Sequence, residues 1–170
     1  MSDLPLTLDE VLVKDISAAV CATMHKTFGV EAVPGPHEIG EGMASLVGDV
    51  SGVIAMVQDR LEGTLILCLT QETVRSLLPS IVGSSTVVSN EMASDAVSEI
   101  TNMVFGQVKR DLGVRGYSLK LGIPCVVTGK GHFVSQFHRG PHMIVPFHIK
   151  GQLFQIYIAL FDSGAKNSSS

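Results

Sequence analysis

The sequence has little charge, and what charge it has is never concentrated. Charged residues make up 16% of the 170 residues, below the roughly one quarter that is usual for soluble domains. Lys and Arg gather into no basic run, and the formal net charge is −4. A nucleic-acid groove needs clustered cations to displace the counterions of the phosphates. The composition therefore argues against nucleic-acid binding, and it suggests that a partner or second copy covers some apolar surface.

Long apolar runs and a basic N-terminus are missing as well. No stretch approaches the roughly 18 consecutive apolar residues that cross a membrane. The N-terminal segment, MSDLPLTLDE, is acidic and lacks the positively charged start of a secretory signal. We therefore expect a cytoplasmic protein without a membrane span.

Cysteine is scarce and its pattern is irregular. The three cysteines, Cys21, Cys68 and Cys125, are odd in number, widely separated and set among apolar residues. This pattern favours small buried thiols over a disulfide framework or a metal site.

Three helices are predicted from apolar residues at helical spacing. They cover residues 8–28, 71–82 and 90–112. Asp9 or Thr7 is a suitable N-cap for the first helix and Thr70 for the second. Gly113 follows the third helix at the position where glycine commonly ends helices.

The rest of the chain is rich in β-branched residues, which predicts strands. The predicted strands are residues 44–57, 61–69, 117–128, 142–149 and 153–161. Residues 58–60 and Gly151 are expected to turn two hairpins, and residues 33–36 to interrupt regular structure.

This order of elements predicts an α+β fold in which a mostly antiparallel sheet is covered by two long helices. A helix followed by a hairpin occurs in residues 8–70, and a helix followed by a longer strand set occurs in residues 90–161, so we expect pseudo-symmetric halves. Residues 1–162 are expected to form one domain. The Ser-rich residues 163–170 are expected to be a disordered tail.

The third helix carries a polar stripe apart from its apolar face. At about 100° per residue, Asp95, Glu99, Asn102 and Gly106 fall on one narrow line. Glu99 and Asn102 stand three residues apart, so their side chains are neighbours. Gly106, one turn further, costs helix stability but leaves a flat spot where another protein's backbone fits. The spacing alone is common on solvated helices, and Gly106 is equally explained by tight packing against the sheet.

The segment Asp95-Ala-Val-Ser-Glu99-Ile-Thr-Asn102-Met-Val-Phe-Gly106 resembles the signature helix of the CheC/CheX/FliY phosphatases of bacterial chemotaxis. Other segments resemble that family in the same order, and the resemblance covers residues 8–161. They are Gly48-Asp-Val-Ser-Gly-Val-Ile, Glu62-Gly-Thr-Leu-Ile-Leu, Leu121-Gly-Ile-Pro124-Cys-Val-Val-Thr-Gly129-Lys-Gly-His132 and Ile144-Val-Pro146-Phe. CheC-type members carry two Glu-x-x-Asn helices and CheX-type members one. The N-terminal helix here has no such motif, so the chain resembles the CheX type.

The resemblance implies a phosphatase that removes the aspartyl phosphate of a CheY-like response regulator in chemotaxis. It implies that Asn102 orients the attacking water, as a glutamine does in some GTPases, and that Glu99 pairs with the regulator's lysine. Asp95 and Gly106 are expected to belong to the docking surface. The regulator would supply Mg²⁺, so no cofactor or metal ligands are expected in this chain. The resemblance also implies a homodimer paired through sheet edges.

Other interpretations fit the residues less well. The same surface would also serve a non-catalytic module that binds receivers or an adaptor, although such a module needs neither Glu99 nor Asn102. A flagellar-switch component is a third possibility, but no added switch-type domain is present. Residues 122–130 resemble a phosphate-binding loop only superficially. Four histidines in the C-terminal third lack the close spacing of metal ligands, and we expect them on loops and strand surfaces: His132, His138, His142 and His148.

Overall fold

The computed structural model describes the chain except for residues 1–6, 43, 60, 84–86, 136–139 and 163–170. The expected disordered tail therefore lies outside the described residues, as does His138. The helices are α1 (Glu10–Phe28), α2 (Gln71–Leu77), α3 (Pro79–Val82) and α4 (Asn90–Val114). The strands are β1 (Ala32–Pro34), β2 (Glu38–Gly42), β3 (Ser45–Gln58), β4 (Leu61–Leu69), β5 (Lys120–Leu121), β6 (Cys125–Ser135), β7 (Gly140–Ile149) and β8 (Gln152–Asp162).

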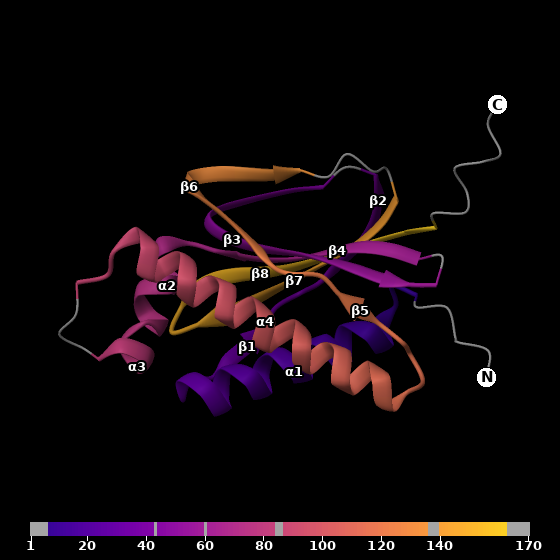
Figure 1. The fold of residues 1–170 in the computed structure, drawn as a ribbon, viewed down its shortest axis with the longest axis horizontal. Helices are drawn as coiled ribbons and strands as arrows, with labels where there is room; N and C mark the ends of the chain where they lie inside the picture. The colour runs from indigo at the N-terminus through magenta and orange to yellow at the C-terminus, as the bar shows by residue number, and fades with distance from the viewer. Residues whose placement is uncertain (1–6, 43, 60, 84–86, 136–139, 163–170) are drawn as a thin grey trace.

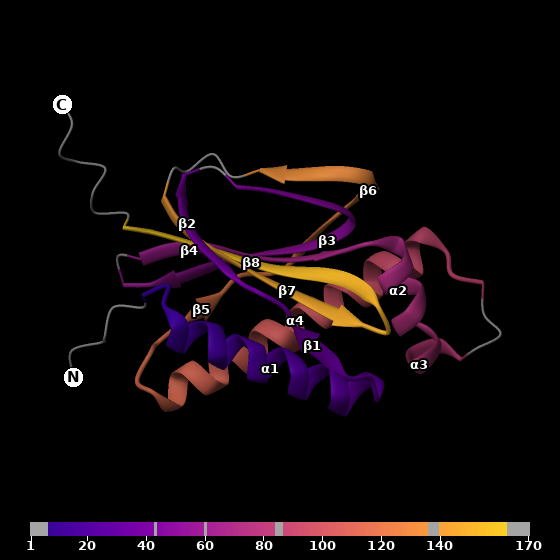
Figure 2. The ribbon, with the colours of Figure 1, turned by 180° about the vertical axis from the view of Figure 1, so that it is seen from behind.

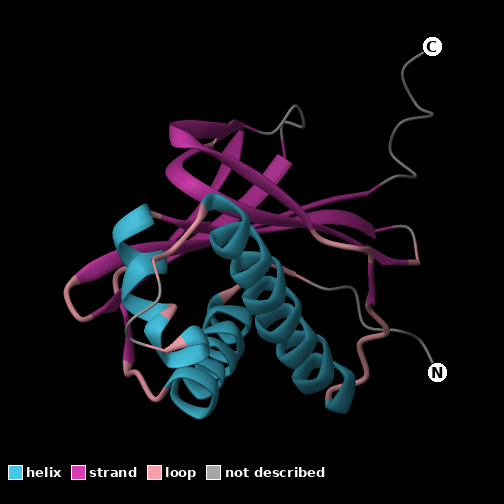
Figure 3. Cartoon of the chain, turned by 60° about the vertical axis from the view of Figure 1, so that its left-hand side comes forward, coloured by secondary structure: helices cyan, strands magenta, loops and turns pink. Residues whose placement is uncertain are grey.

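The eight strands form one sheet in which all the described pairings are antiparallel. Its order is β1-β7-β8-β4-β3-β5, while β2 also pairs with β7 and β6 with β3. The helices lie on one face of the sheet (Figure 3). The outer part of β3 and β6 curl away on the opposite side (Figures 1 and 2). The α+β class and the antiparallel sheet are confirmed, whereas the pseudo-symmetry of the halves stays a prediction.

The central strands are apolar on both faces because both faces are covered. In β4, Leu65, Leu67 and Leu69 belong to the large core under the helices, while Ile66 and Cys68 belong to a smaller cluster on the opposite face. Alternation of side chains along a strand explains this division. Strands buried on both sides are expected to have near-continuous apolar runs, and β4 and β8 have them.

Several local predictions are confirmed at the helix and hairpin ends. Asp9 caps α1 by accepting hydrogen bonds from the backbone N–H groups of Val11 and Leu12, at 3.0 and 2.9 Å. Thr70 caps α2 through the N–H of Thr73. Gly151, with a φ of 80°, turns the β7–β8 hairpin.

The boundaries of the other helices differ from the prediction. The helix expected over residues 71–82 is two short helices, α2 and α3, because Pro79 starts a new helix rather than continuing the first. α4 continues past Gly113 to Val114, and Gly116, with a φ of 95°, is the left-handed residue that follows it. The prediction that Gly113 ends this helix was therefore wrong.

Two edge strands and a long strand also depart from the prediction. Residues 33–36 were expected to be irregular, but β1 includes residues 33 and 34, β2 begins at Glu38, and both strands pair with β7. Proline is tolerated in β1 because an edge strand need not donate on both sides. The strand expected over residues 117–128 is instead the two-residue β5 and the long β6, which runs to Ser135.

The cysteines were only partly predicted. Cys68 is buried, Cys21 is half-buried and Cys125 is exposed, so the expectation of three buried thiols was wrong for Cys125. Within the described residues, no helix has both the length and the apolar character needed to cross a membrane.

Candidate functional site

The helix α4 packs closely on the sheet, and this packing determines which of its side chains face outward. Ser89 caps its N-terminus by accepting a hydrogen bond from the N–H of Met92 at 3.2 Å. Thr101 is fully buried and lies against Gly52 of β3. A Cβ atom at Gly52 would be 1.8 Å from the Thr101 Oγ1, so only glycine allows this approach. The buried face of α4 is Ala96, Val97, Ile100, Thr101, Val104, Phe105, Val108 and Leu112.

The predicted polar stripe lies on the outer side of this helix. Asp95, Glu99 and Asn102 are exposed, next to the buried Ile100 and Thr101. Neither Glu99 nor Asn102 has a hydrogen-bond or ion-pair partner among the described residues. An amide and a carboxylate are therefore presented together to solvent, three residues apart on one rigid helix.

Gly106 is less open than the sequence suggested. The site where its Cβ would be lies 3.7 Å from Nη1 of Arg110, so the guanidinium extends back along α4 to the level of Gly106. The Arg110 Nη2 donates to the Gln107 Oε1 at 2.7 Å, and the Gln107 Nε2 donates to the Asp111 Oδ1 at 2.7 Å. The stripe therefore continues for one turn beyond Gly106 and ends in a positioned cation.

A groove of about 360 Å³ opens between α1 and α4, next to Asn102. Lys26 lies on the α1 side and Arg110 on the α4 side. The described lining residues are Ala22, Thr23, Lys26, Thr27, Asn102, Met103, Gln107 and Arg110. Sequence reasoning missed this groove, because it exists only where α1 packs against α4.

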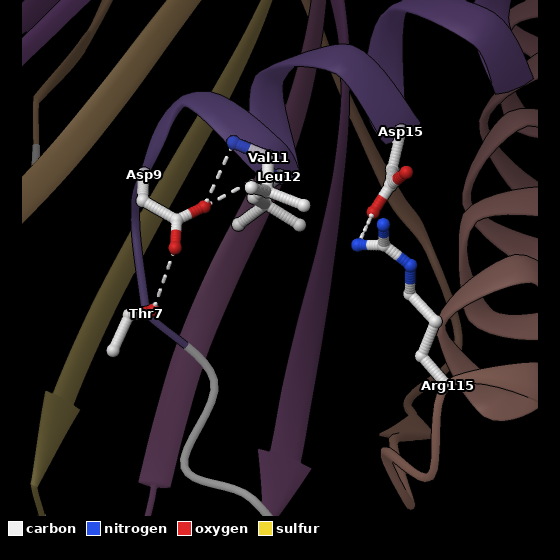
Figure 4. Close-up of polar contacts among 6 residues, drawn as sticks. All are labelled: Thr7, Asp9, Val11, Leu12, Asp15 and Arg115. Atoms are coloured by element: carbon white, nitrogen blue, oxygen red, sulfur yellow. Dashed lines mark hydrogen bonds and ion pairs between the residues drawn. The ribbon is translucent and has the colours of Figure 1, made fainter.

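Polar contacts at the far end of α4 help to fix α1 in place (Figure 4). Arg115, just after α4, forms an ion pair with Asp15 of α1. The cap residue Asp9 also accepts a hydrogen bond from the Thr7 hydroxyl at 3.1 Å. The hydrogen bond from the Leu12 N–H is the main cause that lowers the pKa of Asp9, followed by smaller contributions from Thr7 and Val11. The Asp15–Arg115 pair thus joins α1 to the end of α4.

The model of the family described as chemotaxis phosphatase CheX matches residues 50–148, which include all of α4. The chain belongs to the CheX family. No curated protein sequence matches it.

Solved structures of CheX-family and related proteins have the same fold. A CheX protein from Vibrio vulnificus is 28% identical, with a TM-score of 0.80, covering 89% of this chain and 99% of that one. A chemotactic CheC-like protein from Shewanella oneidensis MR-1 is 30% identical, with a TM-score of 0.75, covering 88% and 97%. The CheX–CheY–BeF₃–Mg²⁺ complex from Borrelia burgdorferi is similar at 17% identity and a TM-score of 0.65, covering 89% and 98%.

A second polar cluster in this CheX-family chain has a structural rather than a chemical role. The Ser51 Oγ lies 2.9 Å from the His132 Nε2, and the His132 Nδ1 lies 2.8 Å from the Gly129 carbonyl oxygen. A carbonyl only accepts, so Nδ1 carries the proton and Nε2 accepts from the serine hydroxyl. Ser51 is fully buried, which prevents it from meeting a substrate. The pair instead ties β3 to β6.

Asp49 extends this tie to α2. Its carboxylate accepts hydrogen bonds from the backbone N–H groups of Gln71 and Gly131, both at 2.8 Å. These two donors, Gln71 first, lower the pKa of Asp49 below its ordinary value. Asp49 lies where the β3–β6 register shifts, between Gly48 and Val50.

Among the residues with a described position, the other histidines and the thiols show no reactive arrangement. His142 is buried, with 3% of its surface exposed, so the expectation that it lies on a strand surface was wrong. Burial raises the pKa of the Cys68 thiol, which disfavours a thiolate nucleophile. No group of three or more His, Cys, Asp and Glu among the residues that the structure describes is arranged to hold a metal ion. The exposed face of α4 is therefore the candidate functional site among the described residues.

Proposed function

We propose that this chain is a phosphatase that hydrolyses the aspartyl phosphate of a CheY-like response regulator in chemotaxis signalling. The observation that carries the proposal is the exposed pair Glu99 and Asn102, which has no hydrogen-bond or ion-pair partner among the described residues, on α4 of a CheX-family chain. The pair lies on an open surface rather than in an enclosed pocket, which suits a macromolecular substrate. The Borrelia burgdorferi complex, which has a similar fold, contains CheY, and this supports a receiver as the partner.

An aspartyl phosphate is an activated acyl phosphate, so the catalyst needs chiefly to place water in line with the phosphorus. In our proposal Asn102 orients that water through its carboxamide. The water oxygen bonds to phosphorus, the bond from phosphorus to the aspartyl oxygen breaks, and inorganic phosphate and a carboxylate are released. Glu99 pairs with the regulator's lysine and fixes the docking, with Asp95 and Gly106 on the same contact surface.

In this proposal the regulator contributes the Mg²⁺ that neutralises phosphoryl charge, and the chain has no cofactor of its own. Each chain has a single site, because α1 lacks the Glu-x-x-Asn pair of α4. We further propose that residues 1–162 form one CheX-like domain with pseudo-symmetric halves. We also propose that the protein is cytoplasmic and forms a homodimer.

The alternative is a non-catalytic module that binds receivers or an adaptor with the same surface. The decay of phosphorylated receivers from the same genome, measured with and without this protein, separates the two functions. We expect the protein to accelerate the decay of at least one CheY-like receiver. Binding to a receiver without any acceleration would replace the phosphatase with the binding module.

A further inference from the structure

The outer surface around α4 has opposite charges on the two sides of Asn102. The exposed acidic side chains Glu91, Asp95 and Glu99 precede it. The exposed cation Arg110 follows it, and Lys26 reaches the same region from α1. This difference in charge divides the contact surface into an acidic half before Asn102 and a positive half after it.

The positive half is a built groove rather than two solvated side chains. Arg110 is held by Gln107, and Gln107 by Asp111, so the guanidinium stays along α4 at the level of Gly106. Gln107 uses one of the five N–H donors of this guanidinium, and among the described residues the others remain for a ligand. Among the described residues that line the groove, the charged ones are Lys26 and Arg110. Lys26 lies in the last turn of α1, where the helix dipole stabilises a cation.

Asn102 itself lines the groove. A partner whose reacting group meets Asn102 must therefore extend over the groove mouth. A volume of about 360 Å³ is large enough for several side chains of a protein segment and far larger than one water. Two cations and an amide that line one groove bind carboxylates or phosphates through charge-assisted hydrogen bonds. In an unmodified protein segment such groups are the carboxylates of Asp and Glu.

We propose that this groove receives an acidic segment of the phosphorylated receiver, whose carboxylates pair with Lys26 and Arg110. This inference rests on the proposed function for the identity of the partner. The acidic half of α4 then faces the receiver's lysine, while the groove takes its carboxylates, so the two halves together fix one docking orientation. Electrostatic complementarity of this kind selects partners and orientations.

The experiment compares two double charge reversals in the full chain. Lys26→Glu with Arg110→Glu reverses the groove. Lys14→Glu with Lys120→Glu makes the same change in net charge at exposed residues outside both the groove lining and α4. Binding is measured with CheY-like receivers of the same genome loaded with beryllofluoride and Mg²⁺, and KM and kcat are measured with the phosphorylated receivers.

We expect the groove variant to weaken binding by roughly tenfold or more and to change KM more than kcat, and the control variant to stay within about twofold of the wild type. Equal losses in both variants, or no loss in the groove variant, would overturn the groove assignment. Binding is measured independently of turnover. If the wild type binds a receiver but does not hydrolyse its phosphate, the phosphatase proposal is wrong, and the comparison of binding between the two variants still tests the groove assignment. A wild type that binds no receiver overturns both.

Discussion

Thr101 of α4 occupies the space that a side chain at Gly52 of β3 would need. A Cβ at Gly52 would lie 1.8 Å from the Thr101 Oγ1 and 2.9 Å from its Cβ. The Thr101 hydroxyl is bonded to the Val97 carbonyl at 2.6 Å and is fully buried, so it has no room to move away. The Thr101 side chain therefore packs directly on the backbone of β3 at Gly52. The exposed neighbours Glu99 and Asn102 take their position from this contact.

Gly52→Ala is expected to destabilise the fold by about 1–3 kcal/mol, the usual cost of overpacking. It is also expected to lower phosphatase activity, because α4 must move away from the sheet. Urea denaturation monitored by circular dichroism gives the stability, and the receiver-decay assay gives the activity. The control is Gly113→Ala in α4, where a Cβ meets nothing within 4 Å. The control should be neutral or stabilising by up to about 1 kcal/mol. Equal stability of the two variants would contradict the close approach.

The predictable part of the fold is the part that local chemistry determines. α1, β3, β4, β7, β8 and most of α4 follow from apolar periodicity and from local signals such as Asp9 and Gly151. β1 and β2 were missed because three and five residues interrupted by proline and glycine carry no strand pattern of their own. Their conformation comes from pairing with β7, 98 to 117 residues away in the chain.

The candidate site was likewise predictable only in part. Helical periodicity was enough to place Asp95, Glu99 and Asn102 on one exposed stripe. The groove was not predictable, because Lys26 and Arg110 meet only through the packing of α1 on α4. One signal was available in the sequence: Arg110 follows Gly106 by four residues, so it continues the stripe.

The proposed roles of Asn102 and Glu99 predict different kinetic defects. Asn102→Ala should abolish accelerated dephosphorylation while receiver binding persists, because only the water loses its orienting group. Glu99→Ala should weaken both binding and turnover, because the pair with the regulator's lysine is lost. Both residues are exposed, so neither change should lower the melting temperature appreciably. Turnover is measured as the decay of phosphorylated receivers, and binding is measured with beryllofluoride-loaded receivers. Full activity of Asn102→Ala against the wild type's substrate would remove Asn102 from the mechanism.

Asp49 predicts a pH-dependent contribution to stability. Hydrogen bonds from Gln71 and Gly131 depress the pKa of its carboxyl. Its stabilising effect is therefore fully present above the unfolded value of about 3.9 and is lost as the pH falls through the lower folded value. Asp49→Asn should cost about 1–2 kcal/mol near neutral pH and flatten the decline of stability below about pH 4. Asp59→Asn, at an exposed turn residue, is the control and should change neither. A decline as steep in Asp49→Asn as in the wild type would refute the assignment.

His142 predicts a stabilising substitution. Its ring is buried at 3% exposure, and neither nitrogen has a hydrogen-bond partner among the described residues. The ring stacks on Tyr157, with centroids 5.7 Å apart and planes 20° apart. Phenylalanine keeps an aromatic ring for this stack and removes two polar atoms whose burial is costly. His142→Phe should therefore raise the free energy of unfolding by about 1 kcal/mol.

The control for this substitution is His148→Phe, on the same strand but at an exposed position. It removes no buried polar atom, so we expect a change within about 0.5 kcal/mol. Both variants are compared by urea denaturation at neutral pH, where the unfolded histidine is mostly uncharged. A loss of stability in His142→Phe larger than in His148→Phe would mean that the imidazole nitrogens stabilise the folded state. The imidazole would then contribute to the stability of the packing on the face of the sheet opposite the helices.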